Sequence, residues 1–166
     1  FTLTSGTNDI TNLAANLVGT LNYREGASAL TVNAAGLSTD IDGNGTLDGT
    51  TTGLTTTGTG TLTPTNGGTL DLAADISTTG TVTQNGAGTV TLTGARTIST
   101  TSDTVDFLRA VMLNGAGTTV AIDTTTAGTG ANITFQSTLD ATTAGAAAED
   151  LTLTAGTGDI TFTGVV

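Results

Sequence analysis

Apolar residues alternate with threonine along most of the chain. Val90-Thr91-Leu92 and Leu151-Thr152-Leu153 are examples, with an apolar side chain at every second position. A period of two predicts β-strands that bury one face. These short runs are separated by stretches rich in Gly and Asn, which predicts many short strands joined by tight turns.

The apolar pattern also recurs at a larger spacing of about twenty residues, the length of one coil in a β-solenoid. The residues that correspond in this way are Leu62 with Val82, Leu70 with Val90, Leu72 with Leu92, and Ile76 with Ile98. In a parallel β-helix each coil stacks its apolar residues on the coil below. We therefore predict an all-β parallel β-helix with short coils. A β-sandwich is the alternative, because alternation within strands does not separate the two folds.

The pattern divides the chain into two regions. Residues 55–166 carry the regular repeats and are predicted to form one continuous solenoid body. Residues 1–54 alternate less and are predicted to form an N-terminal cap or a subunit-contact region. Looser spacing after Ile98 predicts insertions at residues 101–109 and 142–150.

Composition supports a thin core and few helices. Hydrophobic residues make up 36% of the chain but aromatic residues only 3%, and the chain has 24 glycines. Threonine, about a quarter of the residues, favours strands because its branched Cβ fits the pleat. Stacked thin layers need few large side chains, whereas a compact globule normally uses more of them.

Charge excludes several classes of partner. The formal net charge is −11, and the three cations are Arg24, Arg96 and Arg109. Nucleic-acid binding needs a basic surface, so it is not expected. No apolar run reaches the length of a membrane span, so direct insertion into a membrane is not expected either.

Catalysis is also not expected. The chain has no His and no Cys, so neither a catalytic triad nor an imidazole or thiolate metal site can be built. Four acids, Asp71, Asp75, Asp103 and Asp106, could cluster in a β-helix, but isolated acids in turns explain them better. We therefore expect a protein that is not an enzyme.

The sharpest local motif is a candidate calcium loop. Asp40, Asp42 and Asn44 occupy positions 1, 3 and 5 of such a loop, Thr46 would offer its carbonyl at position 7, and Asp48 lies at position 9. Position 12 is a threonine where a bidentate acid belongs. An ordinary Asx and Gly turn between strands is the alternative. Calcium is therefore the candidate cofactor.

Pairs of threonines separated by one residue form a second candidate surface. In a strand, both side chains of such a pair point to the same face. Stacked coils could turn them into a flat array, as in ice-binding β-helices, although an ordinary solvent-facing surface explains them more simply. The pairs are Thr61 with Thr63, Thr81 with Thr83, Thr91 with Thr93, and Thr152 with Thr154.

Two parts of the chain resemble giant bacterial surface proteins. The segments 85–92 and 151–162 look like repeats of filamentous-haemagglutinin-like and autotransporter-like adhesins, a likeness of composition over roughly residues 55–166. Residues 21–42 resemble a fragment of the cadherin-like repeats of the same giant proteins. The resemblance implies a right-handed β-helix stalk that is secreted to the cell surface of a bacterium or another prokaryote.

Both ends of the chain are short, apolar and strand-like, and the open ends of a solenoid expose unpaired strands. We therefore predict an extracellular structural subunit or segment of a fibre, sheath or adhesin stalk. It would polymerise head to tail with copies of itself, through exchange of a terminal strand. The alternative is a ligand-binding adhesin or an ice-binding module, with surface glycans as candidate partners. The predicted subunit-contact residues are Phe1, Leu3, Ile160, Phe162, Val165 and Val166.

Overall fold

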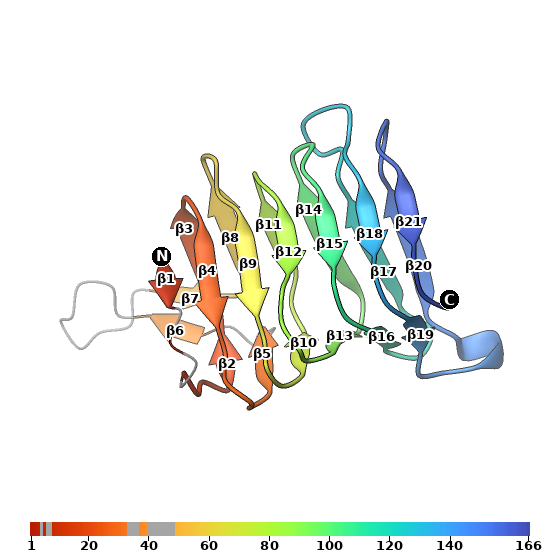
Figure 1. Cartoon of the computed structure of the whole chain (residues 1–166), viewed down its shortest axis with the longest axis horizontal. Coiled ribbons are helices and arrows are strands. Elements are labelled where there is room, and N and C mark those ends of the chain that lie inside the picture. The colour runs from red at the N-terminus through yellow and green to blue at the C-terminus, as the bar shows by residue number, and fades with distance from the viewer. Residues whose placement is uncertain (4, 6–7, 33–36, 40–48) are drawn as a thin grey trace.

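The chain forms a parallel β-helix with its two termini at opposite ends of the rod (Figure 1). The computed structural model describes residues 1–3, 5, 8–32, 37–39 and 49–166. Each coil adds one strand to each of three sheets, which we name A, B and C in the order in which the chain enters them. Neighbouring strands within these sheets run parallel, which confirms the predicted β-helix. A sandwich would have antiparallel sheets.

The strands of the three sheets are short throughout. Sheet A has seven strands, which are β1 (Thr2–Leu3), β4 (Leu21–Arg24), β9 (Leu62–Thr65), β12 (Val82–Gln84), β15 (Val105–Phe107), β18 (Ile133–Phe135) and β21 (Ile160–Phe162). Sheet B has six, which are β2 (Asn12–Leu13), β5 (Leu30–Val32), β10 (Leu70–Leu72), β13 (Val90–Thr93), β16 (Val111–Asn114) and β19 (Leu139–Ala141). Sheet C has six, which are β3 (Ala15–Val18), β8 (Leu54–Thr57), β11 (Ile76–Thr78), β14 (Arg96–Thr100), β17 (Thr119–Asp123) and β20 (Asp150–Thr154).

The register between coils confirms the correspondences read from the sequence. The structure places these residues opposite one another: Leu62 and Val82, Leu70 and Val90, Leu72 and Leu92, Ile76 and Ile98, Ile133 and Ile160, and Phe135 and Phe162. The apolar members of each strand point inward and stack into columns along the axis. These columns form one continuous core that runs through the rod.

Coil length is not constant. Twenty residues separate Leu62 from Val82, as predicted, but twenty-eight separate Val105 from Ile133. The insertion expected at residues 101–109 is wrong, because Val105–Phe107 is the regular strand β15. The extra residues lie instead between β17 and β18 and between β19 and β20. The second of these loops contains the 3-10 turn η1 (Gly145–Ala147), within the insertion predicted at residues 142–150.

The sheets extend across the expected division at residue 54. Strands β1 to β5 belong to the same three sheets as the strands that follow, so the region predicted as a cap contributes regular strands. The described residues between β5 and β8 include β6 (Leu37–Thr39) and β7 (Gly49–Thr51), which pair antiparallel outside the β-helix. No helix among the described residues is long and apolar enough to cross a membrane.

The corner between sheets A and B explains the recurring Asn and Gly residues. Backbone stacks directly on backbone there, and a Cβ built on Gly88 would lie 1.7 Å from the carbonyl oxygen of Gly68. The side chain of Asn66, which is buried, donates to the same carbonyl at 2.8 Å. Glycine is therefore required at this corner by close approach of the coils.

Candidate functional site

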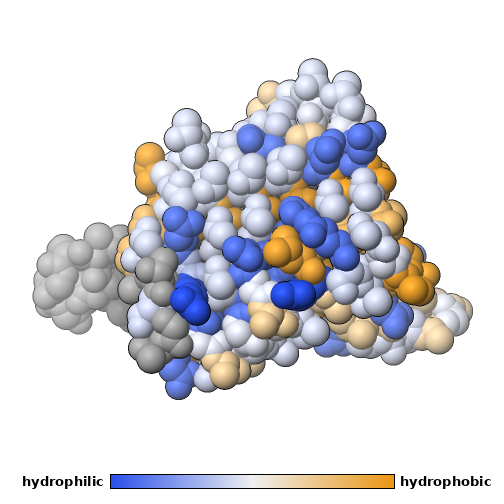
Figure 2. Space-filling view, in the orientation of Figure 1, coloured by the Kyte–Doolittle hydropathy of each residue, from blue (hydrophilic) through white to orange (hydrophobic). Residues whose placement is uncertain are grey.

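The two ends of the rod are where apolar side chains remain uncovered. Within the rod, the inward residues of sheet A are almost fully buried, as Val105 and Ile133 show at 0% exposure. At the C-terminal end the column of Val105 and Ile133 finishes in Ile160, and the column of Phe135 finishes in Phe162; these two residues are 42% and 40% exposed. Figure 2 shows hydrophobic colour at the right-hand edge, where β21 lies, and also a patch near the middle of the visible face.

The C-terminal end also offers the edges of β20 and β21, on which no described strand lies. β19, β20 and β21 are the last strands of sheets B, C and A. After β21 the chain turns back over sheet B, where the amide of Leu139 donates to the carbonyl oxygen of Val165 at 3.0 Å. Val165 and Val166 are exposed. The predicted contact residues Ile160, Phe162, Val165 and Val166 thus lie together at one end of the rod.

The N-terminal end carries the other two predicted contact residues. Phe1 is exposed, and its amino group donates to the carbonyl oxygen of Thr20 at 2.7 Å. Leu3 lies in β1, opposite Tyr23. A hollow of about 400 Å³ opens at this end and is lined by Phe1, Leu13, Ala14, Ala15, Asn16, Leu17, Leu21 and Thr51. The six predicted residues therefore divide between two opposite ends.

The candidate calcium ligands cannot be placed. Asp40, Asp42, Asn44, Thr46 and Asp48 lie outside the described residues. The strand pair β6 and β7 brackets this segment, with Thr39 opposite Gly49. Among the residues that the structure describes, no group of three or more acidic side chains could hold a metal ion. The calcium loop stays a prediction.

The four acids considered for catalysis do not meet. Asp71 lies on sheet B and Asp106 on sheet A, while Asp75 and Asp103 lie at two different corners. Asp71 accepts a hydrogen bond from the Thr93 hydroxyl, at 2.6 Å. Asp106 accepts from Gln136 at 2.8 and 2.9 Å. In both cases the partner belongs to a neighbouring coil, so these acids link coils.

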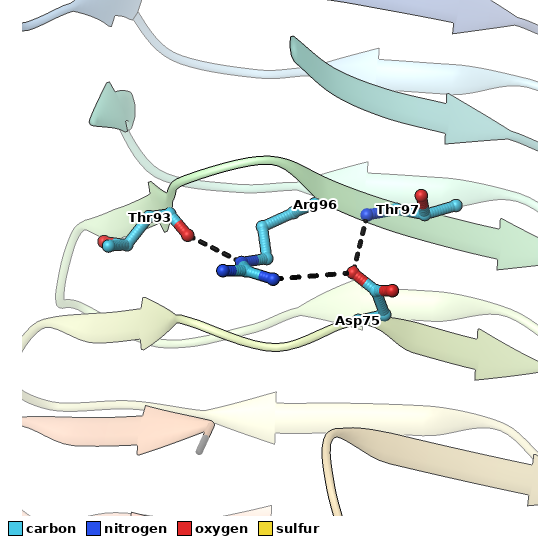
Figure 3. Close-up of polar contacts among 4 residues, drawn as sticks. All are labelled: Asp75, Thr93, Arg96 and Thr97. Carbon is cyan, nitrogen blue, oxygen red and sulfur yellow. Dashed lines mark hydrogen bonds and ion pairs between the residues drawn. The ribbon is translucent and has the colours of Figure 1, made fainter. Parts of the chain in front are cut away.

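Asp75 makes a further link of this kind (Figure 3). Its Oδ1 accepts from the backbone amide of Thr97 at 2.9 Å and lies 3.9 Å from a guanidinium nitrogen of Arg96. Arg96 in turn donates from Nε to the carbonyl oxygen of Thr93, at 2.6 Å. The Asp75 side chain is 65% exposed, so the ion pair adds little stability. The contact orients two adjacent coils.

The threonine pairs do not form one array. Thr63 lies on the outer face of sheet A between Asn22 and Thr83, but the next residue in this column is Asp106. Thr91 lies on sheet B and Thr152 on sheet C, so the remaining pairs face other directions. Only the first two pairs stack in register, and a charge interrupts their column. This arrangement is an ordinary polar face of a β-helix rather than a continuous hydroxyl lattice.

A column of inward threonines was not anticipated from the sequence. Thr56, Thr78, Thr100 and Thr124 stack in sheet C and are at most 2% exposed. Their hydroxyls bind the backbone of the corner that leads to sheet A; Thr78 donates to Gly60 at 2.7 Å and Thr124 donates to Ala131 at 2.8 Å. Among the described residues, no buried side-chain nitrogen or oxygen lacks a partner. The column therefore fixes the conformation of this corner. Burial of the hydroxyls costs little free energy because each of them is hydrogen-bonded.

A second set of buried polar groups lines the corner between sheets A and B. The Tyr23 hydroxyl donates to the Glu25 carboxylate, and burial together with this bond raises the pKa of Tyr23. Gln84 donates to Asn66 at 2.8 Å and accepts from the amides of Leu108 and Arg109. Such polar networks fix which coil packs on which.

Glu149 is the buried acid of the third corner, between sheets B and C. It is 8% exposed and accepts hydrogen bonds from the amide of Gly115 at 3.0 Å, from the Thr142 hydroxyl at 2.7 Å and from the amide of Thr143 at 3.1 Å. The Gly115 amide contributes most, and together these bonds lower the pKa of Glu149 from 4.5 to about 2. The carboxylate thus ties the loop before β20 to the preceding coil.

This contact predicts a loss of stability in acid. Because the pKa is lower in the folded state, the contribution of Glu149 is complete above its ordinary pKa of 4.5 and is lost as the pH falls toward about 2. Glu149→Gln should flatten the fall in unfolding midpoint between pH 5 and pH 2.5, measured by urea unfolding. Asp150→Asn, at an exposed neighbour, is the control. An unchanged pH profile in Glu149→Gln would contradict this assignment.

Comparison with known proteins gives no match to a family model, to a curated protein or to a solved structure. The resemblance of residues 55–166 to bacterial surface adhesins therefore stays a prediction.

Proposed function

We propose that this chain is a non-catalytic, extracellular structural protein, a subunit or segment of a cell-surface fibre, sheath or adhesin stalk. It joins copies of itself head to tail. The observation that carries this proposal is the pair of uncovered ends, with apolar side chains such as Ile160 and Phe162 at one and Phe1 at the other. The resemblance to bacterial adhesins supports a place on the cell surface.

Physical reasons favour the ends as the contact. Uncovered strand edges accept another strand through main-chain hydrogen bonds, and burial of apolar side chains adds affinity. The two ends differ, so contact between them is heterologous. Repeated heterologous contacts form an open filament unless the rotation from one subunit to the next closes a ring. The sides of the rod are polar, and the net charge of −11 opposes side-by-side association.

Self-association of the purified chain tests the proposal. We predict that mass measured by light scattering rises with protein concentration and that electron microscopy shows rods longer than one molecule. Phe162→Asp should raise the concentration needed for assembly at least about tenfold, the equivalent of about 1.4 kcal/mol, because a charge would enter an apolar junction. Thr63→Asp places the same charge on the outer face of sheet A and should leave assembly unchanged. A chain that stays monomeric at all concentrations would contradict the proposal.

Calcium binding at Asp40, Asp42, Asn44, Thr46 and Asp48 is a further part of the proposal, carried by the spacing of these residues in the sequence. Thermal melting with calcium and with a chelator tests it. A melting temperature that does not differ between the two would remove calcium from the proposed function.

Binding to surface glycans or to ice is the second candidate function. The observation on its side is that the outward pairs Thr61 with Thr63 and Thr81 with Thr83 stack in register, although this array spans two coils and ends at Asp106. Thermal hysteresis or a glycan-array signal from the monomer would support this function over assembly.

A further inference from the structure

The two ends of the rod carry complementary parts of one coil. At the C-terminal end, β21 supplies the sheet A strand, and the carbonyl oxygen of Val165 accepts from the amide of Leu139 at the edge of sheet B. Within the described residues no strand of sheet C follows β20. At the N-terminal end, β2 and β3 supply a short strand of sheet B and a full strand of sheet C. Together, β21 from one end and β2 and β3 from the other end would make up one coil with a strand in each sheet.

The register shows that these parts fit in sequence along sheet B. The amide of Leu139 bonds to Val165, which places Val166 opposite Leu139, in the column that starts at Leu30. Asn12 lies opposite Thr31, and Leu13 lies opposite Val32. The amide of Thr31 donates to the carbonyl oxygen of Thr11, so Thr11 holds the column of Leu30 in the monomer. If the two ends shared one coil, Val165 would come before Asn12 and Leu13 of the next copy, and Val166 and Thr11 would compete for the one column between them.

β1 occupies the place that β21 would take in this shared coil. Among the described residues, β1 pairs with β4 at Thr2 and Leu3, Asn8 adds hydrogen bonds to Arg24 and Gly26, and Phe1 is 66% exposed. Residues 4–11 connect β1 to β2, whereas residues 136–138 suffice between β18 and β19. The segment 1–4 reads Phe-Thr-Leu-Thr, and the segment 160–163 reads Ile-Thr-Phe-Thr, with the same alternation of apolar and hydroxyl side chains.

We propose that β21 of one copy displaces β1 of the next copy and pairs in parallel with β4. Ile160, Thr161 and Phe162 would lie opposite Leu21, Asn22 and Tyr23 of the next copy. This inference rests on the proposed head-to-tail assembly and assigns its junction. β1 acts as a placeholder strand within the monomer and leaves the coil on assembly.

Strand spacing favours displacement over simple stacking of intact ends. With β1 displaced, β3 of the next copy lies directly on β20, and every sheet continues at the usual spacing of about 4.8 Å. With β1 retained on β21, sheet C would lack one strand at the junction and leave edges of β20 and β3 unpaired.

The core also continues across the shared coil. Phe162 already stacks on Phe135, with ring centroids 5.3 Å apart and planes 7° from parallel. In the junction its other face would meet Tyr23 of the next copy, which occupies the same column. Ile160 would likewise meet Leu21. The two exposed side chains of β21 would then be buried on both faces.

Cysteine crosslinking of the full chain tests this junction, and the absence of native cysteine makes the result unambiguous. We predict that Thr161→Cys mixed with Asn22→Cys forms a disulfide-linked dimer on oxidation, because opposed residues of neighbouring strands lie within disulfide range. Thr161→Cys mixed with Thr2→Cys reports simple stacking and should give no dimer. Thr63→Cys with Thr83→Cys in one chain is the positive control, since these residues lie opposite each other within the rod.

The outcomes separate this inference from the proposed function. A dimer through Thr161 and Thr2, or filaments without a crosslink at Asn22, would overturn the displacement of β1 and leave head-to-tail assembly standing. A chain that stays monomeric and forms neither intermolecular crosslink would overturn both. A dimer through Thr161 and Asn22 supports both.

Discussion

Replacing Phe135 by alanine should lower the free energy of unfolding by about 3–5 kcal/mol, the range for a buried Phe→Ala change. Phe135 is 1% exposed, and its ring stacks between Phe107, at 5.4 Å between centroids, and Phe162, at 5.3 Å. In a core with few large side chains, neighbours cannot collapse into the space left by a lost ring. Urea unfolding followed by circular dichroism measures the loss.

Phe162→Ala is the matched control for this prediction. Phe162 belongs to the same column but lies at the end of the rod and is 40% exposed. Its removal from the monomer should cost only about 1–2 kcal/mol, because less area is buried and one ring contact is lost. Equal losses for the two variants would mean that the stack does not carry the stability of the C-terminal coils.

The linear architecture predicts where the damage appears. In a solenoid each coil contacts only its neighbours, so a local loss destabilises adjacent coils before distant ones. Hydrogen exchange of the Phe135→Ala variant should therefore show lost protection in β18 to β21 while β9 to β12 keep theirs. Uniform loss along the chain would instead show that the rod unfolds as one cooperative unit.

The stacking of the coils could be predicted well because the inward positions of the core columns must be apolar, and this requirement is visible directly in the sequence. Leu70 and Val90, or Ile76 and Ile98, are apolar for the same reason, namely that each covers the next in a column. The parallel β-helix, the register of these residues and the position of the predicted contact residues at the two ends all follow from that pattern.

The buried polar contacts were harder to predict from the sequence. Thr78 and Thr100 lie two residues after Ile76 and Ile98 and so point inward, which was not predicted. The recurring Ile-Ser-Thr motif is the signal that could have revealed this column, but threonine is common on outer faces too. The contacts of Glu149 with Gly115 and Thr142 depend on how a loop folds back, which no local pattern encodes.

The candidate site was only partly predictable for a related reason. Apolar, strand-like segments at both ends indicated contact surfaces, but alternation could not show that Val166 and Asn12 fall in consecutive columns of sheet B. That relation depends on the register across six coils, and coil length varies along the chain. The same limit explains the error at residues 101–109, where a longer coil was read as an insertion in place of β15.

Removing residues 1–11 should speed assembly rather than abolish it. In the proposed junction this segment competes with β21 of the neighbouring copy for the edge of β4. If the segment holds that edge by as little as about 1.4 kcal/mol, its removal raises the fraction of free edges about tenfold. The lag before assembly, followed by light scattering at a fixed concentration, should shorten accordingly.

A matched variant separates this effect from nonspecific aggregation. This variant combines the deletion of residues 1–11 with Phe162→Asp. The edge of β4 is as open as in the deletion alone, but β21, the strand that would pair with it, now carries a charge. This double variant should assemble at least tenfold more slowly than the deletion alone, whereas nonspecific aggregation would be as fast in both. If β1 itself were the strand donated to a neighbour, the deletion would instead remove filaments altogether. The direction of the change therefore decides which of the two terminal strands, β1 or β21, joins one copy to the next.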